Sequence, residues 1–291
     1  MQEASITVKL SSRISLAIAK RIPRGYYQIL KFAAERDPAL QDMPIRLKDI
    51  PHCLRGDLRE SVFTALYRTG CIPHQTGFDL LCRRLLRPGD VVYDVGANVG
   101  YTTTLFSHIV GSEGHVIAVE PSPRSFALLS RSIAGAVGNV TLLNLGVSCK
   151  AGQLVFYVPP SLDRASFVPI SGAEKVQVAV SSLDDLCASH GYPRFIKVDV
   201  EGHEPSVFEG ATATLQRDDR PIVIFEALGT ECLERCLGLL SERSGEGYEY
   251  RRIRNDGALV SLEAAGSSDY IAIPRWAKER AGHLPGGDEA P

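Results

Sequence analysis

The residues best suited to chemistry lie in one run, 195–204, where a predicted strand ends in charged side chains. A central parallel strand is normally apolar on both faces, and charges there are costly unless they are paired or face a cleft. Alternation along the strand places Lys197, Asp199 and Glu201 on one side. Because ligands bind at this end of parallel strands, we predict that the segment is catalytic. An ion pair between Lys197 and Asp199 that only holds the strand end is the structural alternative.

Two further residues complete the catalytic candidates. Glu226 closes the next predicted strand and points to the same edge of the sheet. His203 has an ordinary pKa near neutrality, which suits a general base, although a histidine at a helix start also bonds to the backbone. We expect Asp199, His203 and Glu201 to orient the substrate or remove its proton, supported by Lys197 and Glu226. Two carboxylates with one histidine do not define a metal site, so metal stays undecided and a site without one is favoured.

A second group of residues follows an earlier predicted strand. The run Asp94–Gly100 (DVGANVG) forms a strand-to-helix turn whose glycines allow the backbone to approach a ligand closely. Glu120 ends the next strand twenty residues later, where an acidic side chain accepts hydrogen bonds from ribose hydroxyls. The pattern therefore predicts a nucleoside-containing cofactor.

Two cofactor classes compete for this turn. A dinucleotide needs G-x-G-x-x-G, but residue 98 is Asn and the glycines are four apart. Asp94 would repel a pyrophosphate, whereas it suits the ammonium and sulfonium groups of S-adenosylmethionine. We therefore predict S-adenosylmethionine as the cofactor. In the alternative, the glycines only serve packing and Glu120 is a surface cap.

The elements that position these residues alternate between short apolar strands and helices, which predicts a doubly wound, mostly parallel α/β sheet. The alternation breaks at a predicted antiparallel hairpin around the loop 159–173, and two strands around the turn 255–257 close the sheet. The expected strands are 91–95, 116–120, 140–145, 154–158, 176–180, 195–200, 222–226, 248–253 and 270–273, and the expected helices are 101–109, 125–136, 204–215 and 231–240.

The same pattern divides the chain into three zones. Residues 1–88 are expected to form a helical extension, with short helices in 12–34 split by Pro23 and Gly25, and further helices at 61–67 and 77–86. Residues 89–275 form the α/β domain, with the hairpin inserted at about 151–181. The tail 276–291 is rich in Gly, Pro and charge and is expected to be disordered.

Composition excludes several other roles. The net charge of −2 gives no sequence-wide electrostatic case for nucleic acid or a membrane surface. The seven cysteines are scattered and form no C-x-x-C pair; Cys232 and Cys236 fit a buried pair, with a metal or redox pair as the alternative. No N-terminal apolar run is long enough for a signal peptide, so a cytoplasmic protein is expected. Apolar N-terminal helices leave a homodimer open.

Taken in order, the motifs resemble the FkbM family of methyltransferases. The resemblance covers about 89–228 and rests on Asp94–Gly100, Val119–Pro121, Ser182–Leu186, Ile196–Glu204 and Phe225–Glu226. Ser182 stands where the family commonly has Thr. The resemblance implies a seven-stranded class I sheet with an antiparallel strand near one edge, and S-adenosylmethionine as methyl donor. Its implied donor positions are Asp94, Gly96, Ala97, Asn98, Gly100, Glu120 and Pro121, with Asn144, Gly146 and Val147 near the adenine.

The resemblance also implies O-methylation of a sugar or natural-product hydroxyl, with S-adenosylhomocysteine as the product. N-methylation of an amino sugar or amine is the enzymatic alternative, and a non-catalytic donor-binding subunit is the alternative from another class. The acceptor itself has no readable motif.

Overall fold

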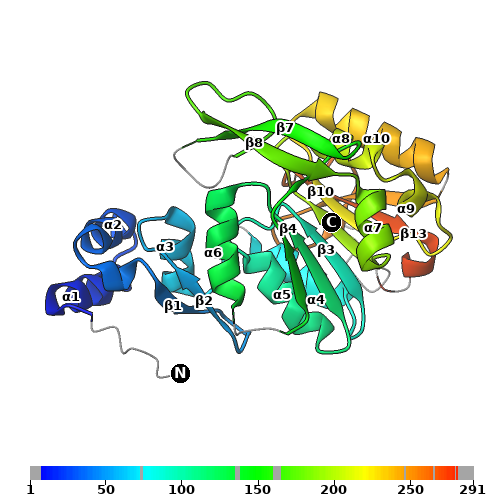
Figure 1. Ribbon diagram of the computed structural model, residues 1–291. Coiled ribbons are helices and arrows are strands. Elements are labelled where there is room, and N and C mark those ends of the chain that lie inside the picture. The colour runs from blue at the N-terminus through cyan, green and yellow to red at the C-terminus, as the bar shows by residue number, and fades with distance from the viewer. Residues whose placement is uncertain are drawn as a thin grey trace. The chain divides into compact units, whose positions relative to one another are not determined.

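The computed structural model describes residues 8–72, 75–134, 138–159, 165–245, 247–264, 266–278 and 280. Most of the tail, which was expected to be disordered, lies outside these residues, as does part of the loop 159–173. The chain divides into a smaller unit, residues 1–75 with 131–136, and a larger unit, residues 76–130 with 137–291. Figure 1 traces the elements of each unit by colour and label.

The smaller unit is built from three helices and a short hairpin. Pro23 and Gly25 separate the first two helices, as the sequence predicted, because Gly25 has a positive φ and proline breaks a helix. The antiparallel pair β1–β2 was not predicted; its four-residue strands are too short to show alternation, and β1 contains Pro44. The elements are α1 (Leu10–Ala19), α2 (Tyr26–Arg36), η1 (Pro38–Leu40), β1 (Met43–Arg46), β2 (Cys53–Gly56) and α3 (Ser61–Thr69).

The larger unit is organised around an eight-stranded sheet of order β12–β11–β13–β10–β9–β3–β4–β5. The five strands from β10 to β5 are parallel, and β13 is antiparallel between β10 and β11. This confirms the doubly wound fold, with β12 as one edge strand more than predicted. The strands are β3 (Val91–Val95), β4 (His115–Val119), β5 (Val140–Leu143), β9 (Phe195–Val198), β10 (Ile222–Glu226), β11 (Tyr248–Ile253), β12 (Leu259–Val260) and β13 (Asp269–Pro274).

Helices cover both faces of this sheet. On one face Phe106 contacts Phe78 and Phe195, with ring centroids 6.3 and 5.5 Å apart. On the other face Tyr93 and Ile196 belong to a buried apolar cluster with side chains of the later helices. The helices are α4 (Thr76–Leu85), α5 (Tyr101–Val110), α6 (Pro123–Ile133), α7 (Leu183–His190), α8 (Glu204–Glu209), α9 (Thr212–Gln216), α10 (Thr230–Ser244) and η4 (Arg275–Ala277).

The predicted hairpin exists, but it belongs to a separate sheet. The strands β7 (Gly152–Val158) and β8 (Glu174–Ser181) pair antiparallel, and the short β6 (Gly146–Val147) adds to β8. Because the chain runs from β3 outward to β5 and returns to β9 on the other side of β3, a topological switch lies between β3 and β9. Open α/β sheets bind ligands at the carboxyl ends of the strands beside such a switch.

One predicted helix was wrong. The expected helix 204–215 is two short helices, α8 and α9, separated at Gly210. A Cβ atom at Gly210 would lie 2.3 Å from the carbonyl oxygen of Ser148, so a segment distant in the sequence occupies the space that a helical side chain needs. The strands predicted at 140–145 and 195–200 also end two residues earlier, at Leu143 and Val198.

Candidate functional site

The turn between β3 and α5 is pressed against the end of β9. The N–H groups of Gly96 and Ala97 both donate to the carbonyl of Val119, at 3.0 Å. Gly96 has φ +84°, and a Cβ atom there would lie 1.8 Å from the carbonyl oxygen of Asp199. Only glycine fits, since both the backbone conformation and the close approach exclude a side chain. Asn98 and Gly100 also have positive φ, at 49° and 91°, so the turn is tight throughout.

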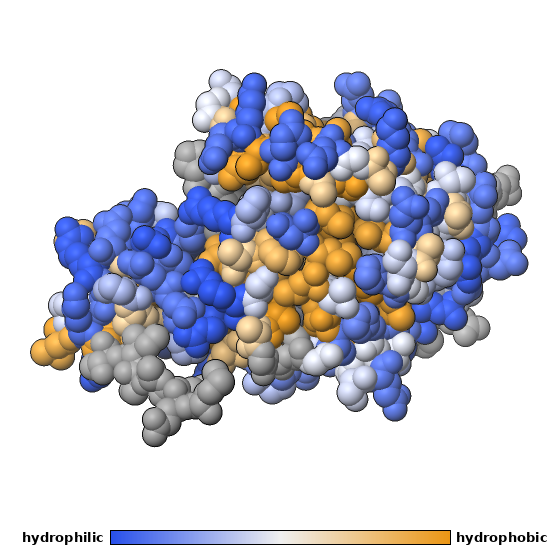
Figure 2. All heavy atoms as spheres, in the orientation of Figure 1, coloured by the Kyte–Doolittle hydropathy of each residue, from blue (hydrophilic) through white to orange (hydrophobic). Residues whose placement is uncertain are grey.

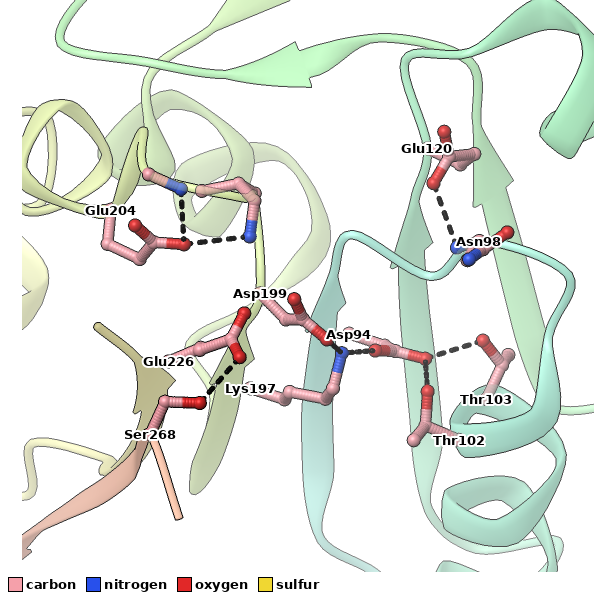
Figure 3. Close-up of polar contacts among 12 residues, drawn as sticks. Asp94, Asn98, Thr102, Thr103, Glu120, Lys197, Asp199, Glu204, Glu226 and Ser268 are labelled. Carbon is pink, nitrogen blue, oxygen red and sulfur yellow. Dashed lines mark hydrogen bonds and ion pairs between the residues drawn. The ribbon is translucent and has the colours of Figure 1, made fainter. Parts of the chain in front are cut away.

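Glu120 follows β4 and closes the other side of the turn. Its carboxylate accepts hydrogen bonds from the backbone N–H groups of Asn98 (Figure 3) and Ser122, both at 2.8 Å. Burial raises the pKa of Glu120 to about 7, although these two hydrogen bonds favour the ionised form. Asn144 donates from Nδ2 to the Glu120 carbonyl at 2.8 Å, so it supports this residue from behind.

Asp94 and Lys197 form a buried charged pair beneath the turn, because β3 and β9 are aligned so that these two residues face each other. The fully buried Asp94 accepts hydrogen bonds from Thr102 and Thr103 at 2.8 and 2.6 Å, and its other oxygen lies 3.7 Å from Lys197 Nζ. Lys197 Nζ also donates to Asp199 at 3.0 Å. Burial disfavours the ammonium, but Asp199 and Asp94 overcome it and raise the pKa of Lys197, which therefore stays charged.

Three carboxylates gather at the ends of β9 and β10. One oxygen from each of Asp199, Glu201 and Glu226 lies within 4.8 Å of the other two. Glu226 accepts a hydrogen bond from Ser268 at 2.7 Å, and burial together with the charge of Asp199 raises its pKa. The predicted convergence of these side chains is thus present. Their oxygens are of the kind that divalent cations bind, but the ammonium of Lys197 already compensates Asp199.

Glu204 holds the turn that presents Glu201. It is fully buried, and its Oε1 accepts hydrogen bonds from the N–H groups of Val200 and Gly202, at 3.0 and 3.3 Å. Glu201 and Gly202 have φ of 54° and 95°, so this segment is not an extension of β9. Burial raises the pKa of Glu204 to about 8. The sequence analysis gave Glu204 no role, although a buried acid three residues after Glu201 could have been recognised as a turn cap.

These segments line a cleft, partly open to solvent, at the topological switch. The lining residues come from the glycine turn, the β4 and β9 ends and the inserted sheet: Val95, Gly96, Asn98, Val119, Glu120, Pro121, Ser125, Gly146, Val147, Phe156, Ala165, Phe167, Asp199, Val200 and Glu201.

The inserted sheet supplies an aromatic wall that sequence reasoning missed. Phe156 and Phe167 contact each other with ring centroids 4.8 Å apart, and both line the cleft. Ser166 Oγ donates to the carbonyl of Glu201 at 2.7 Å, which ties the segment to the turn at 200–202. A Cβ atom at Gly146 would lie 2.4 Å from the Phe167 ring, so Gly146 makes room for the wall.

His203 has contacts that favour packing over proton transfer. Its ring lies 4.7 Å from that of Phe167, and Nε2 is 3.0 Å from Ser148 Oγ. Burial lowers the pKa of His203 to about 4, which makes it a weak base near neutral pH.

Of the predicted donor-site residues, Gly96, Asn98, Glu120, Pro121, Gly146 and Val147 line the cleft. Asp94, Ala97, Gly100 and Asn144 are absent from its described lining. Of the catalytic candidates, Asp199 and Glu201 line the cleft. Lys197 and Glu226 do not line it but lie next to Asp199, Lys197 as its ion-pair partner and Glu226 with a carboxylate oxygen within 4.8 Å.

Comparison with known proteins places this site in a family. Residues 94–236 match the methyltransferase FkbM domain. The hexuronic acid methyltransferase AglP of Haloferax volcanii is 33% identical over 140 residues, which are 47% of this chain and 56% of the relative. The 31-O-demethyl-FK506 methyltransferase FkbM of Streptomyces tacrolimicus is 30% identical over 43% of this chain and 60% of the relative. The chain thus spans a little over half the length of these curated relatives.

Among solved structures, the crystal structure of methyltransferase FkbM from Methylobacillus flagellatus KT is 14% identical, with a TM-score of 0.46, and covers 90% of this chain and 58% of that one. The segment that matches the FkbM domain begins at Asp94 and extends past Glu226, so it contains the glycine turn, Glu120 and the charged end of β9. Residues 94–236 of this chain therefore make up a methyltransferase FkbM domain.

Proposed function

We propose that this protein is an S-adenosylmethionine-dependent O-methyltransferase that acts on a hydroxyl group of a sugar or natural-product small molecule. The observation that carries the proposal is that the glycine turn and Glu120 line the same cleft as Asp199 and Glu201. Donor-binding and acceptor-activating groups must meet in one site, because methyl transfer needs its two reactants aligned.

The residues of the cleft fit the donor. A Cβ atom at Gly96 would collide with the carbonyl oxygen of Asp199, so glycine lets the turn lie directly against the end of β9, and both segments line the cleft. Glu120 would accept hydrogen bonds from the ribose hydroxyls, and Pro121, Gly146 and Val147 provide a small apolar surface for the adenine. When bound, the donor supplies a methyl group on a positively charged sulfur.

The chain's own residues would orient the acceptor and take its proton. Asp199 lines the cleft and is held by Lys197 at 3.0 Å, so its carboxylate is fixed in direction and available to accept a hydrogen bond from a hydroxyl. Glu201 lies close enough to share that acceptor. Phe156 and Phe167 contribute two aromatic rings to the wall of the cleft. His203, with its lowered pKa and its packed ring, is the weaker candidate for the base.

The charges of the site also limit the class of acceptor. Three carboxylates face one ammonium, so a carboxylate acceptor would be repelled, whereas hydroxyl groups can donate hydrogen bonds to Asp199 and Glu201. An amine would also be accepted, which keeps N-methylation as the alternative. An amine with a suitable pKa needs less help from a base.

The test is a screen of sugars, hydroxylated natural products and amines with methyl-labelled donor, run on the wild type and on Asp199→Asn. We expect the variant to lose on the order of 10²–10⁴-fold in turnover while its donor affinity, measured by calorimetry, changes little. Asp218→Asn, an exposed aspartate of the same unit, is the matched control. Wild-type turnover in Asp199→Asn refutes the assigned role, and insensitivity to both Asp199→Asn and His203→Ala with an amine acceptor favours N-methylation. Donor binding without methylation of any acceptor favours a non-catalytic subunit.

A further inference from the structure

Helix α1 of the smaller unit has two apolar faces, of which one is exposed. Ser12, Leu16 and Ala19 are buried. The stripe formed by Leu10, Ile14 and Ile18 is exposed, with relative accessibilities of 75%, 54% and 43%. The stripe residues are four apart, so they lie along the side of the helix opposite to the buried face. Figure 2 shows hydrophobic atoms at the surface over α1, with hydrophilic atoms beside them.

The stripe lies within a strongly cationic segment. Residues 8–34 contain six basic side chains and no aspartate or glutamate, so the segment has a charge of +6 in a chain whose net charge is −2. All six are exposed, and in the described part of the chain the ion pairs involve other residues. The six are Lys9, Arg13, Lys20, Arg21, Arg24 and Lys31.

We propose that α1 and its neighbouring cations form a docking surface for an anionic phospholipid bilayer. A short amphipathic helix lies in the plane of the bilayer with its apolar residues at the boundary between headgroups and acyl chains. Basic residues beside the helix are attracted by the negative potential of anionic lipids. Leu10, Ile14 and Ile18 supply the first feature, and the six cations supply the second.

Charge complementarity selects this occupant over two others. A second copy of the chain would bring the same +6 segment, so pairing of two α1 helices would be opposed by repulsion between like charges. A nucleic acid would match the cations but would leave three aliphatic side chains without apolar contact. A bilayer with anionic lipid accommodates both features. No described helix is long and apolar enough to cross a membrane, so the attachment would be peripheral and reversible.

The test is flotation of the 291-residue chain with vesicles. One set contains phosphatidylcholine alone, and the other contains phosphatidylcholine with phosphatidylglycerol at about 3:1. We expect binding only to the anionic vesicles, and a large loss of binding between about 0.1 M and 1 M salt, because salt screens the exposed cations. Equal binding to both sets, or binding to neither, overturns the proposal.

Two variants separate the contributions of the surface. The triple variant Leu10→Ser, Ile14→Ser, Ile18→Ser removes the stripe, and the double variant Arg13→Glu, Lys20→Glu reverses two charges. Each is expected to lower the vesicle partition coefficient by on the order of tenfold or more. The matched controls, Leu80→Ser and Lys150→Glu, change exposed residues of the larger unit and should bind as the wild type does.

Other results count against the bilayer. Vesicle binding that survives both α1 variants, or that falls equally in the controls, overturns the proposal. So does an unchanged partition coefficient in α1 variants that instead lose self-association in sedimentation or lose binding to single-stranded RNA. Because none of the substituted residues lines the cleft, methyltransferase activity without vesicles should be unchanged. Failure of this proposal therefore leaves the proposed reaction intact.

Discussion

Replacement of Glu204 tests whether a buried acid holds the turn at 200–202. In Glu204→Ala, the N–H groups of Val200 and Gly202 lose their acceptor. An unpaired buried donor costs about 1–3 kcal/mol, and these two residues are only half-buried, so water can reach part of the turn. Together with the loss of the buried side chain, we expect the free energy of unfolding to fall by roughly 2–4 kcal/mol. In Glu204→Gln, the retained Oε1 oxygen keeps both hydrogen bonds, and the cost should be below about 1 kcal/mol.

The pH dependence gives this prediction a sign. An ordinary glutamate has a pKa near 4.5, whereas burial raises that of Glu204 to about 8 in the folded protein. Between these values the folded state binds the proton and the unfolded state does not, so the contribution of Glu204 to stability falls as pH rises, by up to about 1.4 kcal/mol per unit. It levels off above about pH 8. Glu204→Gln cannot ionise and should gain on the wild type by roughly 2–3 kcal/mol between about pH 5.5 and 7.5.

The assay is urea unfolding of the wild type and both variants at these two pH values, followed by turnover with an identified acceptor. Glu174→Gln, an exposed glutamate of β8, is the control. Because the turn positions Glu201 beside Asp199, turnover should fall in Glu204→Ala and be largely retained in Glu204→Gln. If both variants unfold at the same urea concentration, or if Glu204→Gln keeps the pH dependence of the wild type, the reasoning is refuted.

Two more predictions concern the donor and metal dependence. Glu120→Ala should weaken donor binding. In the wild type, the affinity for S-adenosylhomocysteine should rise between about pH 6 and 8, because burial raises the pKa of Glu120 to about 7 and the ionised carboxylate accepts hydrogen bonds from the ribose hydroxyls better. A dissociation constant that is unchanged by calorimetry would remove Glu120 from the ribose site. A chelator should leave turnover within about twofold of its starting value, because the ammonium of Lys197 already neutralises the charge of Asp199. If the chelator abolishes turnover and Mg²⁺ restores it, a cation is assigned to Asp199, Glu201 and Glu226.

The strands of the sheet were predictable because the sequences of buried parallel strands consist of continuous apolar runs. Val91–Val95 and Ile222–Glu226 lie where the sequence placed them. The short hairpin β1–β2 and the break at Gly210 were not predictable, because neighbours distant in the sequence determine them. Local pattern therefore gave the positions of the sheet strands but not the contacts between segments.

The proposed donor side of the site follows the same division. The glycine turn and Glu120 lie beside one cleft where the sequence placed them, because their positions depend on backbone conformation and strand ends. The surroundings of Asp94 were harder to infer. It was expected to face the ligand, but it points into the face covered by α5, where Thr102 and Thr103 bind it. A carboxylate one residue before the end of a strand can point to either face, and the helix residues that receive it decide its role.

The acceptor half depends on a link that no local motif shows. Glu204 holds the turn 200–202 from inside the domain, and Ser166 of the insertion binds the Glu201 carbonyl from the cleft side. The direction of the Glu201 side chain is therefore set jointly by a family motif and by the insertion between β7 and β8. The same insertion also supplies Phe167 to the cleft wall, so one segment contacts both the wall and the turn at 200–202. Because these contacts join segments that are distant in the sequence, no local motif could predict this side of the cleft.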